Sequence, residues 1–305
     1  MSKATEKQLL LGIDGGASKT EFLLTDFNLK PLKSLKIGQG SNPWHLGLDQ
    51  TLKVIEKGLK SFDPALLKKV VFLYAGISGC FGDSRYNEQI NSCLKGYVKN
   101  KRVSGDLYSS FRSLSRSKYG LLAIAGTGSA MAHFDKDDRN SLMGLAFGGR
   151  DFGYLILRNL IKGNLEDRKY LKSFLEQNVD IEYLRSSKLD SWLKHRGLVD
   201  LAAKLSTLEY EDNVFKELKI FMDLVVDRWV YKIFAYACKY SYQKRSKFEL
   251  VLSGNFWRFT YIRKAVIKEL KDYLPNAQVR YSEKIRPVIG CVKLAKECYL
   301  EQGEK

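Results

Sequence analysis

The stretch LLLGIDGGASKTEFLLTD, residues 9–26, joins two apolar runs through a turn that contains an aspartate, two glycines, a serine, a lysine and a threonine. An Asp-Gly pair between apolar runs is a strong signal for a β-hairpin. Glycine also lets a backbone approach a phosphate closely, and amide and hydroxyl groups can donate hydrogen bonds to it. The stretch therefore predicts a hairpin, and it leaves open whether that hairpin also binds a phosphate group.

Length and composition indicate a globular protein of two domains. The chain has 305 residues, of which 45% are hydrophobic, enough for two cores of ordinary size. Residues 1–14 contain no apolar stretch of signal-peptide length, and polar residues and glycines interrupt the least polar window, 119–134. The five cysteines form no C-x-x-C pair and the three histidines lie far apart, so no disulfide framework or zinc site is predicted. We expect a cytoplasmic protein that does not cross a membrane.

The charge is strongly basic. The sequence has 51 Lys and Arg against 34 Asp and Glu, a formal net charge of +17, which favours anionic partners. The basic residues are scattered, without a run of five or six and without an RNA-binding or helix-turn-helix signature. Nucleic-acid binding is therefore not expected as a main function, and a solvated basic surface is the simpler interpretation.

The apolar spacing predicts alternating strands and helices. Runs at 9–13, 21–25 and 32–37 indicate three consecutive antiparallel strands. The same strand–turn–strand pattern recurs at 120–134, so a second domain is expected to begin near Tyr119. Further strands are expected at 70–75, 102–104 and 248–252, and helices at 48–62, 86–97, 107–116, 218–237, 260–270 and 287–299.

Each predicted domain opens with a glycine turn between two strands. The first turn is not a P-loop, because Ser18 stands where that motif has a glycine before the lysine. The second turn, Gly126-Thr127-Gly128-Ser129, is not a dinucleotide fingerprint, because it joins two strands and has Met131 in place of the third glycine. Two phosphate-binding hairpins that face each other would hold ATP between two domains.

Six segments occur along the chain in a fixed order: Asp14-Gly15-Gly16-Ala17-Ser18-Lys19-Thr20, Ser41-Asn42, SGDLYSSF with Asp106, Gly126 to Ser129, LVLSGNFW and PVIGCVKLA. Together they resemble the acetate-kinase, sugar-kinase, heat-shock ATPase and actin superfamily. Within it, they are similar to the N-acetylglucosamine kinases and the related BadF/BadG/BcrA/BcrD ATPases. The likeness spans nearly the whole chain, and the order of the motifs makes it specific.

The resemblance implies a fold and two bound molecules. The fold would be α/β, with two ribonuclease H-like (actin/hexokinase-like) domains, 1–117 with 286–305 and 118–285, and an interdomain cleft for ATP and a sugar. ATP and Mg²⁺ are the implied cofactors, and Asp14 is expected to hold the metal through water. The implied ligands of the ATP phosphates are Gly15, Gly16, Ser18, Lys19, Thr20, Thr127, Gly128 and Ser129.

The resemblance also implies the remaining site residues. The family's general base stands at the start of a helix, a place that Asp106 occupies here. Adenosine would be bound by Ser253, Gly254 and Asn255, and the sugar by Asn42, Asp106, Gly126 and Asp151.

One segment departs from the family pattern. Where the family has G-D-E-G-S after the second phosphate hairpin, this chain reads FGGRDFG, so Gly149 and Arg150 replace the two acidic residues. Asp151 could take the place of the missing acidic sugar ligand if the loop shifts. It is equally consistent with the sequence that Arg150 and Asp151 are an exposed charged pair in a turn. The cysteines also lack the spacing of the iron–sulfur ligands of BcrA-like activators.

The implied function is that of an ATP-dependent amino-sugar kinase. It would phosphorylate N-acetylglucosamine or a related murein amino sugar at the 6-hydroxyl by direct in-line transfer. A nucleotide-driven ATPase or regulator of the same superfamily and a sugar-binding protein without transfer activity remain alternatives. The sequence leaves the identity of the sugar and a homodimer open.

Overall fold

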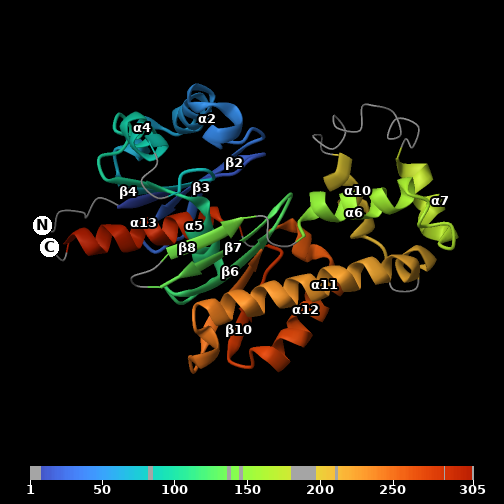
Figure 1. Ribbon diagram of the computed structural model, residues 1–305. Coiled ribbons are helices and arrows are strands. Elements are labelled where there is room, and N and C mark those ends of the chain that lie inside the picture. The colour runs from blue at the N-terminus through green and yellow to red at the C-terminus, as the bar shows by residue number, and fades with distance from the viewer. Residues whose placement is uncertain are drawn as a thin grey trace, which may run out of the picture. The chain divides into compact units, whose positions relative to one another are not determined.

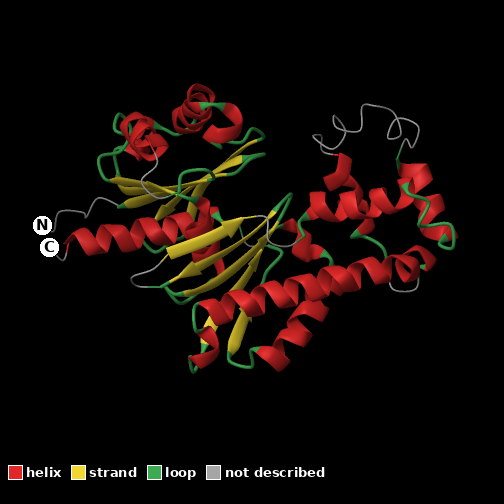
Figure 2. Cartoon of the chain, in the orientation of Figure 1, coloured by secondary structure: helices red, strands yellow, loops and turns green. Residues whose placement is uncertain are grey.

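The computed structural model describes residues 8–81, 85–135, 139–143, 147–179, 197–209, 212–284 and 286–303 (Figure 1). The contacts within the chain divide it into two units, Met1–Lys118 with Lys284–Lys305, and Tyr119–Glu283. Each unit contains one five-stranded sheet with helices around it (Figure 2). The predicted α/β class is therefore confirmed.

The sheet of the first unit has the strand order β3-β2-β1-β4-β5. Its antiparallel half comprises β1 (Leu9–Gly15), β2 (Thr20–Asp26) and β3 (Pro31–Ile37), and its parallel half adds β4 (Val70–Ile77) and β5 (Lys101–Ser104). Asp14 lies opposite Gly76, and Gly76 lies opposite Ser104. The carboxyl ends of β1, β4 and β5 therefore meet at one edge of the sheet.

Alternation along β1 places helices on both faces of this sheet. Leu9, Leu11 and Ile13 are buried in a core with α2 (Leu48–Lys60) and α4 (Arg85–Leu94). Leu10 points the other way, into a core shared with α13 (Val288–Gly303), and α13 also packs against α5 (Asp106–Leu114). Two short helices, α1 (Pro43–Leu46) and α3 (Pro64–Leu67), complete this unit.

The second unit repeats the topology of the first. Its sheet has the order β10-β9-β6-β7-β8. The antiparallel half comprises β6 (Gly120–Ala125), β7 (Ser129–Phe134) and β8 (Arg139–Met143), and the parallel half adds β9 (Phe248–Ser253) and β10 (Ala277–Arg280). In both units a meander of three strands is thus extended by two parallel strands on the side of its first strand.

Helices of the second unit extend its core beyond the sheet. They are α6 (Gly149–Ile161), α7 (Lys169–Asn178), α10 (Gly197–Leu205), α11 (Asn213–Lys239) and α12 (Thr260–Tyr273), with short 3₁₀ turns at Tyr242–Lys244 and Asn255–Arg258. Figure 1 shows α11 running from the sheet to α7, which it contacts. The buried rings of Trp229 and Trp257 lie 4.8 Å apart in this core.

The predicted elements are found with boundaries that differ by a few residues, and two strands were missed. β10 has the sequence AQVR and only four residues, so it shows no apolar alternation. β8 has the sequence RNSLM, which carries no alternation either. Among the described residues, no helix combines the length and the apolar character that crossing a bilayer requires.

Candidate functional site

The first glycine turn connects β1 to β2, and its carbonyl groups are paired. The Gly15 carbonyl accepts from the Ser78 amide at 2.7 Å, and the Gly16 carbonyl accepts from the Ser41 amide at 3.0 Å. The Gly16 amide donates to the Lys19 carbonyl at 3.0 Å, which closes the turn. The turn is therefore held to two loops, one after β3 and one after β4.

The amides of the same turn are not paired. Within the described part of the chain, the backbone amides of Ala17, Ser18 and Lys19 donate to no acceptor. A row of unpaired amides in a tight turn is a site for an anion such as a phosphate. The Lys19 ammonium, by contrast, pairs with Glu21 at 2.6 Å, and the Thr20 hydroxyl donates to the Gln39 carbonyl at 3.0 Å.

Glycine is required where the loop after β3 touches the hairpin. A Cβ on Gly15 would lie 2.1 Å from Ser41 Oγ, and a Cβ on Gly40 would lie 2.2 Å from the Ala17 carbonyl oxygen. Both distances are far below van der Waals contact, so neither position accepts a side chain. The loop that carries the predicted sugar ligand Asn42 is thereby packed directly on the hairpin.

Asp14, at the end of β1, is a buried carboxylate. Its carboxyl oxygens accept no hydrogen bond from the described residues, and 7% of the residue is exposed. Burial, together with the charges of Asp106 and Glu21, raises its pKa to about 8, although Lys19 opposes the rise. At neutral pH this carboxyl is therefore mostly protonated, and a cation that binds there would displace the proton.

Asp106 begins α5, directly after β5 and the N-cap residue Gly105. Its Oδ1 atom is buried and has no hydrogen-bond partner among the described residues. Burial raises the pKa of this carboxyl to about 6, although hydrogen bonds from its own backbone amide and from Ser78 oppose the rise. Asp106 is therefore more basic than a solvated aspartate but still mostly ionised at neutral pH.

Asn42 lies close to Ser78, the residue that also interacts with Asp106. It is the N-cap of α1, where its Oδ1 accepts from the Trp44 amide at 2.9 Å, and its Nδ2 donates to Ser78 Oγ at 3.4 Å. The Trp44 indole donates to the Gly79 carbonyl at 2.9 Å. Gly79 has φ +90°, and a Cβ there would lie 2.8 Å from Asn42 Oδ1.

Ser78 and Gly79 were missed by the sequence reasoning. The signal that could have found them is positional, because a Ser-Gly pair directly after a buried parallel strand lies at the same sheet edge as the residues after β1 and β5. Cys80, the next residue, is buried, and burial raises the pKa of its thiol to about 12. It therefore stays protonated and is not a nucleophile at neutral pH.

The second glycine turn has the same arrangement. The Gly126 amide donates to the Gly128 carbonyl at 2.9 Å, and the Gly126 carbonyl accepts from the Gly149 amide at 2.7 Å. Thr127 and Gly128 have amides that donate to no acceptor in the described ranges. A Cβ on Gly126 or Gly128 would meet nothing within 4 Å, so the space beside both glycines is open.

Two further glycines of the second unit pack closely against the backbone at this turn. A Cβ on Gly148 would lie 2.5 Å from the Gly128 backbone. Gly254, with φ +104°, would place a Cβ 2.3 Å from the Ala125 carbonyl oxygen. The parallel register pairs Ile124 with Ser253, so the predicted adenosine segment and the second glycine turn leave the sheet side by side.

Asp151 has a structural role in the second unit. It is the third residue of α6, and its Oδ2 accepts from the amide of the N-cap residue Gly148 at 3.0 Å, which is one half of a capping box. Arg150 lies 3.8 Å from its other oxygen. One carboxylate oxygen is therefore used by the helix cap, and sugar binding by Asp151 stays a prediction.

The structure brings the predicted residues together in two groups. In the first unit, the hairpin, Asp14, Asn42 and Asp106 gather at the carboxyl edge of one sheet. In the second unit, the turn at 126–129 lies beside 253–255. No group of three or more His, Cys, Asp or Glu side chains that could hold a metal occurs among the described residues, and metal binding by Asp14 stays a prediction.

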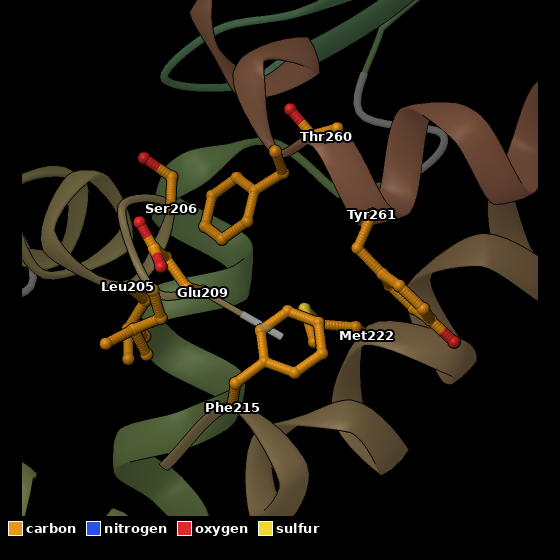
Figure 3. A pocket seen from close by; sticks show the side chains of 9 residues that line it. Leu205, Ser206, Glu209, Phe215, Met222, Thr260 and Tyr261 are labelled. Carbon is orange, nitrogen blue, oxygen red and sulfur yellow. The ribbon is translucent and has the colours of Figure 1, made fainter. Parts of the chain in front are cut away.

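A cavity of about 390 Å³ lies elsewhere in the second unit, between the end of α10, α11 and the start of α12 (Figure 3). Phe215, Met222 and Tyr261 are among the residues that line it, and none of the predicted site residues does. It is therefore not a part of the site described above.

No protein-family model and no curated protein matches the sequence. Among solved structures, the chain is similar to a candidate N-acetylglucosamine kinase from Porphyromonas gingivalis, with a TM-score of 0.70 and 18% identity over 94% of this chain and 99% of that one. The fold is therefore the actin/hexokinase-like fold. A candidate N-acetylglucosamine kinase from Chromobacterium violaceum is also similar, with a TM-score of 0.63 and 14% identity over 95% and 99% of the two chains. A ROK family glucokinase from Streptomyces griseus, in complex with glucose and AMPPNP, has a TM-score of 0.61 and 12% identity over 95% and 99%.

Proposed function

We propose that the protein is an ATP-dependent kinase that phosphorylates an amino sugar, N-acetylglucosamine or a related murein sugar, at its 6-hydroxyl. The observation that carries the proposal is Asp106, a carboxyl at a helix start that shares the neighbour Ser78 with Asn42 and lies at the same sheet edge as a turn with unpaired amides. The fold supports it, because proteins described as sugar kinases share that fold.

The reaction would be a direct transfer. The acceptor hydroxyl oxygen forms a bond to the γ-phosphorus while the bond from that phosphorus to the bridging oxygen breaks, and ADP leaves. Asp106 receives the proton of the attacking hydroxyl. The unpaired amides of each glycine turn are donors for phosphoryl oxygens, on which charge develops during transfer. The interdomain cleft stays a prediction of the sequence.

The residues present fit a magnesium ion that arrives with the nucleotide. Mg²⁺ is usually held by one or two carboxylates together with substrate phosphates and water, and Asp14 offers one carboxylate without a hydrogen-bond partner among the described residues. When bound, the ion would neutralise phosphate charge. A nearby cation would also lower the pKa of Asp14 from about 8 and keep it ionised.

The test is an ADP-release assay with Mg²⁺ and ATP over N-acetylglucosamine, N-acetylmuramic acid, glucosamine, N-acetylmannosamine, glucose and no sugar. We expect ADP only with one or two amino sugars. Asp106→Asn should lower turnover by about two to four orders of magnitude and keep sugar binding in calorimetry, because it removes the general base. Wild-type turnover in that variant would exclude Asp106 from the mechanism.

A nucleotide-driven ATPase is the second candidate. It is favoured by the missing G-D-E-G-S segment and by the use of Asp151 in the cap of its own helix. ADP release that does not depend on any sugar would identify it. Sugar binding without any ADP would instead identify a binding protein that lacks transfer activity.

A further inference from the structure

The orientation of the Asn42 amide is determined by the helix that it caps. The Trp44 backbone amide can only donate, so the Asn42 atom 2.9 Å away must be the oxygen. The other atom of the amide, which faces Ser78 Oγ at 3.4 Å, is therefore the nitrogen. This assignment follows from donor and acceptor chemistry and excludes the flipped amide.

The orientation of Asn42 in turn directs the Ser78 hydroxyl. An amide nitrogen only donates, so Ser78 Oγ must accept from Asn42 and its own hydrogen must point elsewhere. Ser78 is also held through its backbone, because its amide donates to the Gly15 carbonyl at 2.7 Å. The parallel register that pairs Gly76 with Ser104 brings Ser78 and Asp106, each two residues further on, to the same sheet edge, so the Asp106 carboxyl is an acceptor within reach of the Ser78 hydroxyl.

We propose that Asn42 and Ser78 form a directed chain of hydrogen bonds, from the Asn42 amide to the Ser78 hydroxyl to the Asp106 carboxyl, that orients Asp106 for proton transfer. Asn42 and Ser78 are then positioning residues. The chain leaves Asp106 Oδ1, which has no partner among the described residues, as the oxygen that receives the acceptor's proton. A hydrogen bond donated to a carboxyl also favours its ionised form, which a base needs. The inference rests on the proposed function.

Asn42→Asp is the sharpest variant. Aspartate caps a helix as well as asparagine does, so α1 keeps its cap. The atom that faces Ser78 becomes an acceptor, which would turn the Ser78 hydroxyl away from Asp106. Ser78→Ala removes the hydroxyl, and Ser78→Thr keeps it. The matched control is Asp63→Asn, which exchanges the same two residue types at the cap of α3, where Asp63 also precedes a proline and accepts from the Ala65 amide.

We expect Asn42→Asp and Ser78→Ala each to lower kcat by about 10- to 100-fold, the usual cost of a misplaced catalytic group, with KM for ATP unchanged. Ser78→Thr should restore most of kcat, and Asp63→Asn should behave as wild type. The kcat of the double variant should be no lower than that of the slower single variant, because both substitutions break the same chain of hydrogen bonds. The proposal would be overturned if the decreases in kcat multiplied in the double variant. It would also be overturned if the single variants raised only the KM for the sugar and left kcat unchanged.

A second readout does not need turnover. In NMR spectra, the side-chain amide of Asn42 and the carboxyl carbon of Asp106, assigned by its loss in Asp106→Asn, should both shift in Ser78→Ala but not in Asp63→Asn. Unchanged signals would overturn the chain of hydrogen bonds even in an active enzyme. Shifted signals in a protein that releases no ADP with any sugar would keep the chain and reject the kinase.

Discussion

Two buried carboxyls, Asp14 and Asp106, are the residues on which the proposed chemistry depends. Burial is the largest cause of the raised pKa in both, but Asp14 also faces the charges of Asp106 and Glu21, whereas Ser78 opposes the rise at Asp106. Their pKa values of about 8 and about 6 differ accordingly. Such a difference allows two like groups to take different roles, which in the proposed function are those of a metal ligand and a base.

The pH dependence of turnover should report the Asp106 carboxyl. A base acts in its ionised form, and its pKa is raised to about 6, so kcat should fall as the pH falls through about 6. The measurement is kcat between pH 4.5 and 8 at saturating Mg²⁺, ATP and sugar, with thermal unfolding at each pH to exclude loss of the fold. An acid limb near pH 4, the value of a solvated aspartate, would contradict this assignment.

At alkaline pH and without magnesium, the ionised Asp14 carboxylate should lower the free energy of unfolding. Its folded-state pKa of about 8 exceeds the value of 3.8 for a solvated aspartate, so its contribution to stability is fully present below pH 3.8 and is lost as the pH rises through about 8. Asp14→Asn removes that cost. We expect the variant to gain more than about 1 kcal/mol in free energy of unfolding at pH 8.5 without Mg²⁺ or ATP, given about 1.4 kcal/mol per unit of pKa shift.

Denaturant unfolding at pH 8.5 and at pH 4 measures this gain, which should shrink at the lower pH. Asp63→Asn, which changes an exposed helix cap, is the control. A gain in Asp14→Asn that is the same at both pH values would mean that ionisation of Asp14 is not its cause.

In the second glycine turn, neighbouring elements shape the proposed anion site. Gly126 faces open space, whereas Gly148, just before α6, has no room for a side chain against Gly128. We expect Gly126→Ala to keep the melting temperature but weaken ATP binding, because the new methyl group fills the space beside the unpaired amides. Gly148→Ala should lower the melting temperature as well, because the turn must move. Calorimetry with ATP and thermal unfolding distinguish the two, and equal stability losses would contradict the geometry.

The sequence predicted the elements that have strong local signals. The Asp-Gly pair at 14–15 and the recurrence at 120–134 predicted both hairpins, because turn chemistry is local. It did not predict that Ser78 and Gly79 would meet Asn42, because that contact depends on the parallel pairing of β1 with β4, which joins residues far apart in the chain. The cap made by Asp151 was also not predicted, although an acidic residue in the first turn of a helix is typical.

At the scale of the molecule, one topology occurs twice with little shared sequence. Both sheets have a three-strand meander extended by two parallel strands, and in both the glycine turn follows the first strand. The order of six short motifs was enough to predict the actin/hexokinase-like fold. The sugar could not be predicted in the same way, since the segment at 148–153 departs from the pattern that would have named its ligands.

The tryptophans in the described part of the chain provide an intrinsic fluorescence signal for both glycine turns. Trp257 follows Gly254 and donates to the Ala123 carbonyl at 3.0 Å, and Trp229 donates to the Phe147 carbonyl at 3.0 Å, next to Gly148. These two indoles are buried, so we expect their emission to lie at short wavelength and to respond to changes at the turn at 126–128. Trp44 is 68% exposed beside Asn42, and its emission is at long wavelength. Among the three tryptophans that the structure describes, the emission wavelength is therefore expected to distinguish events at the two glycine turns without any attached label.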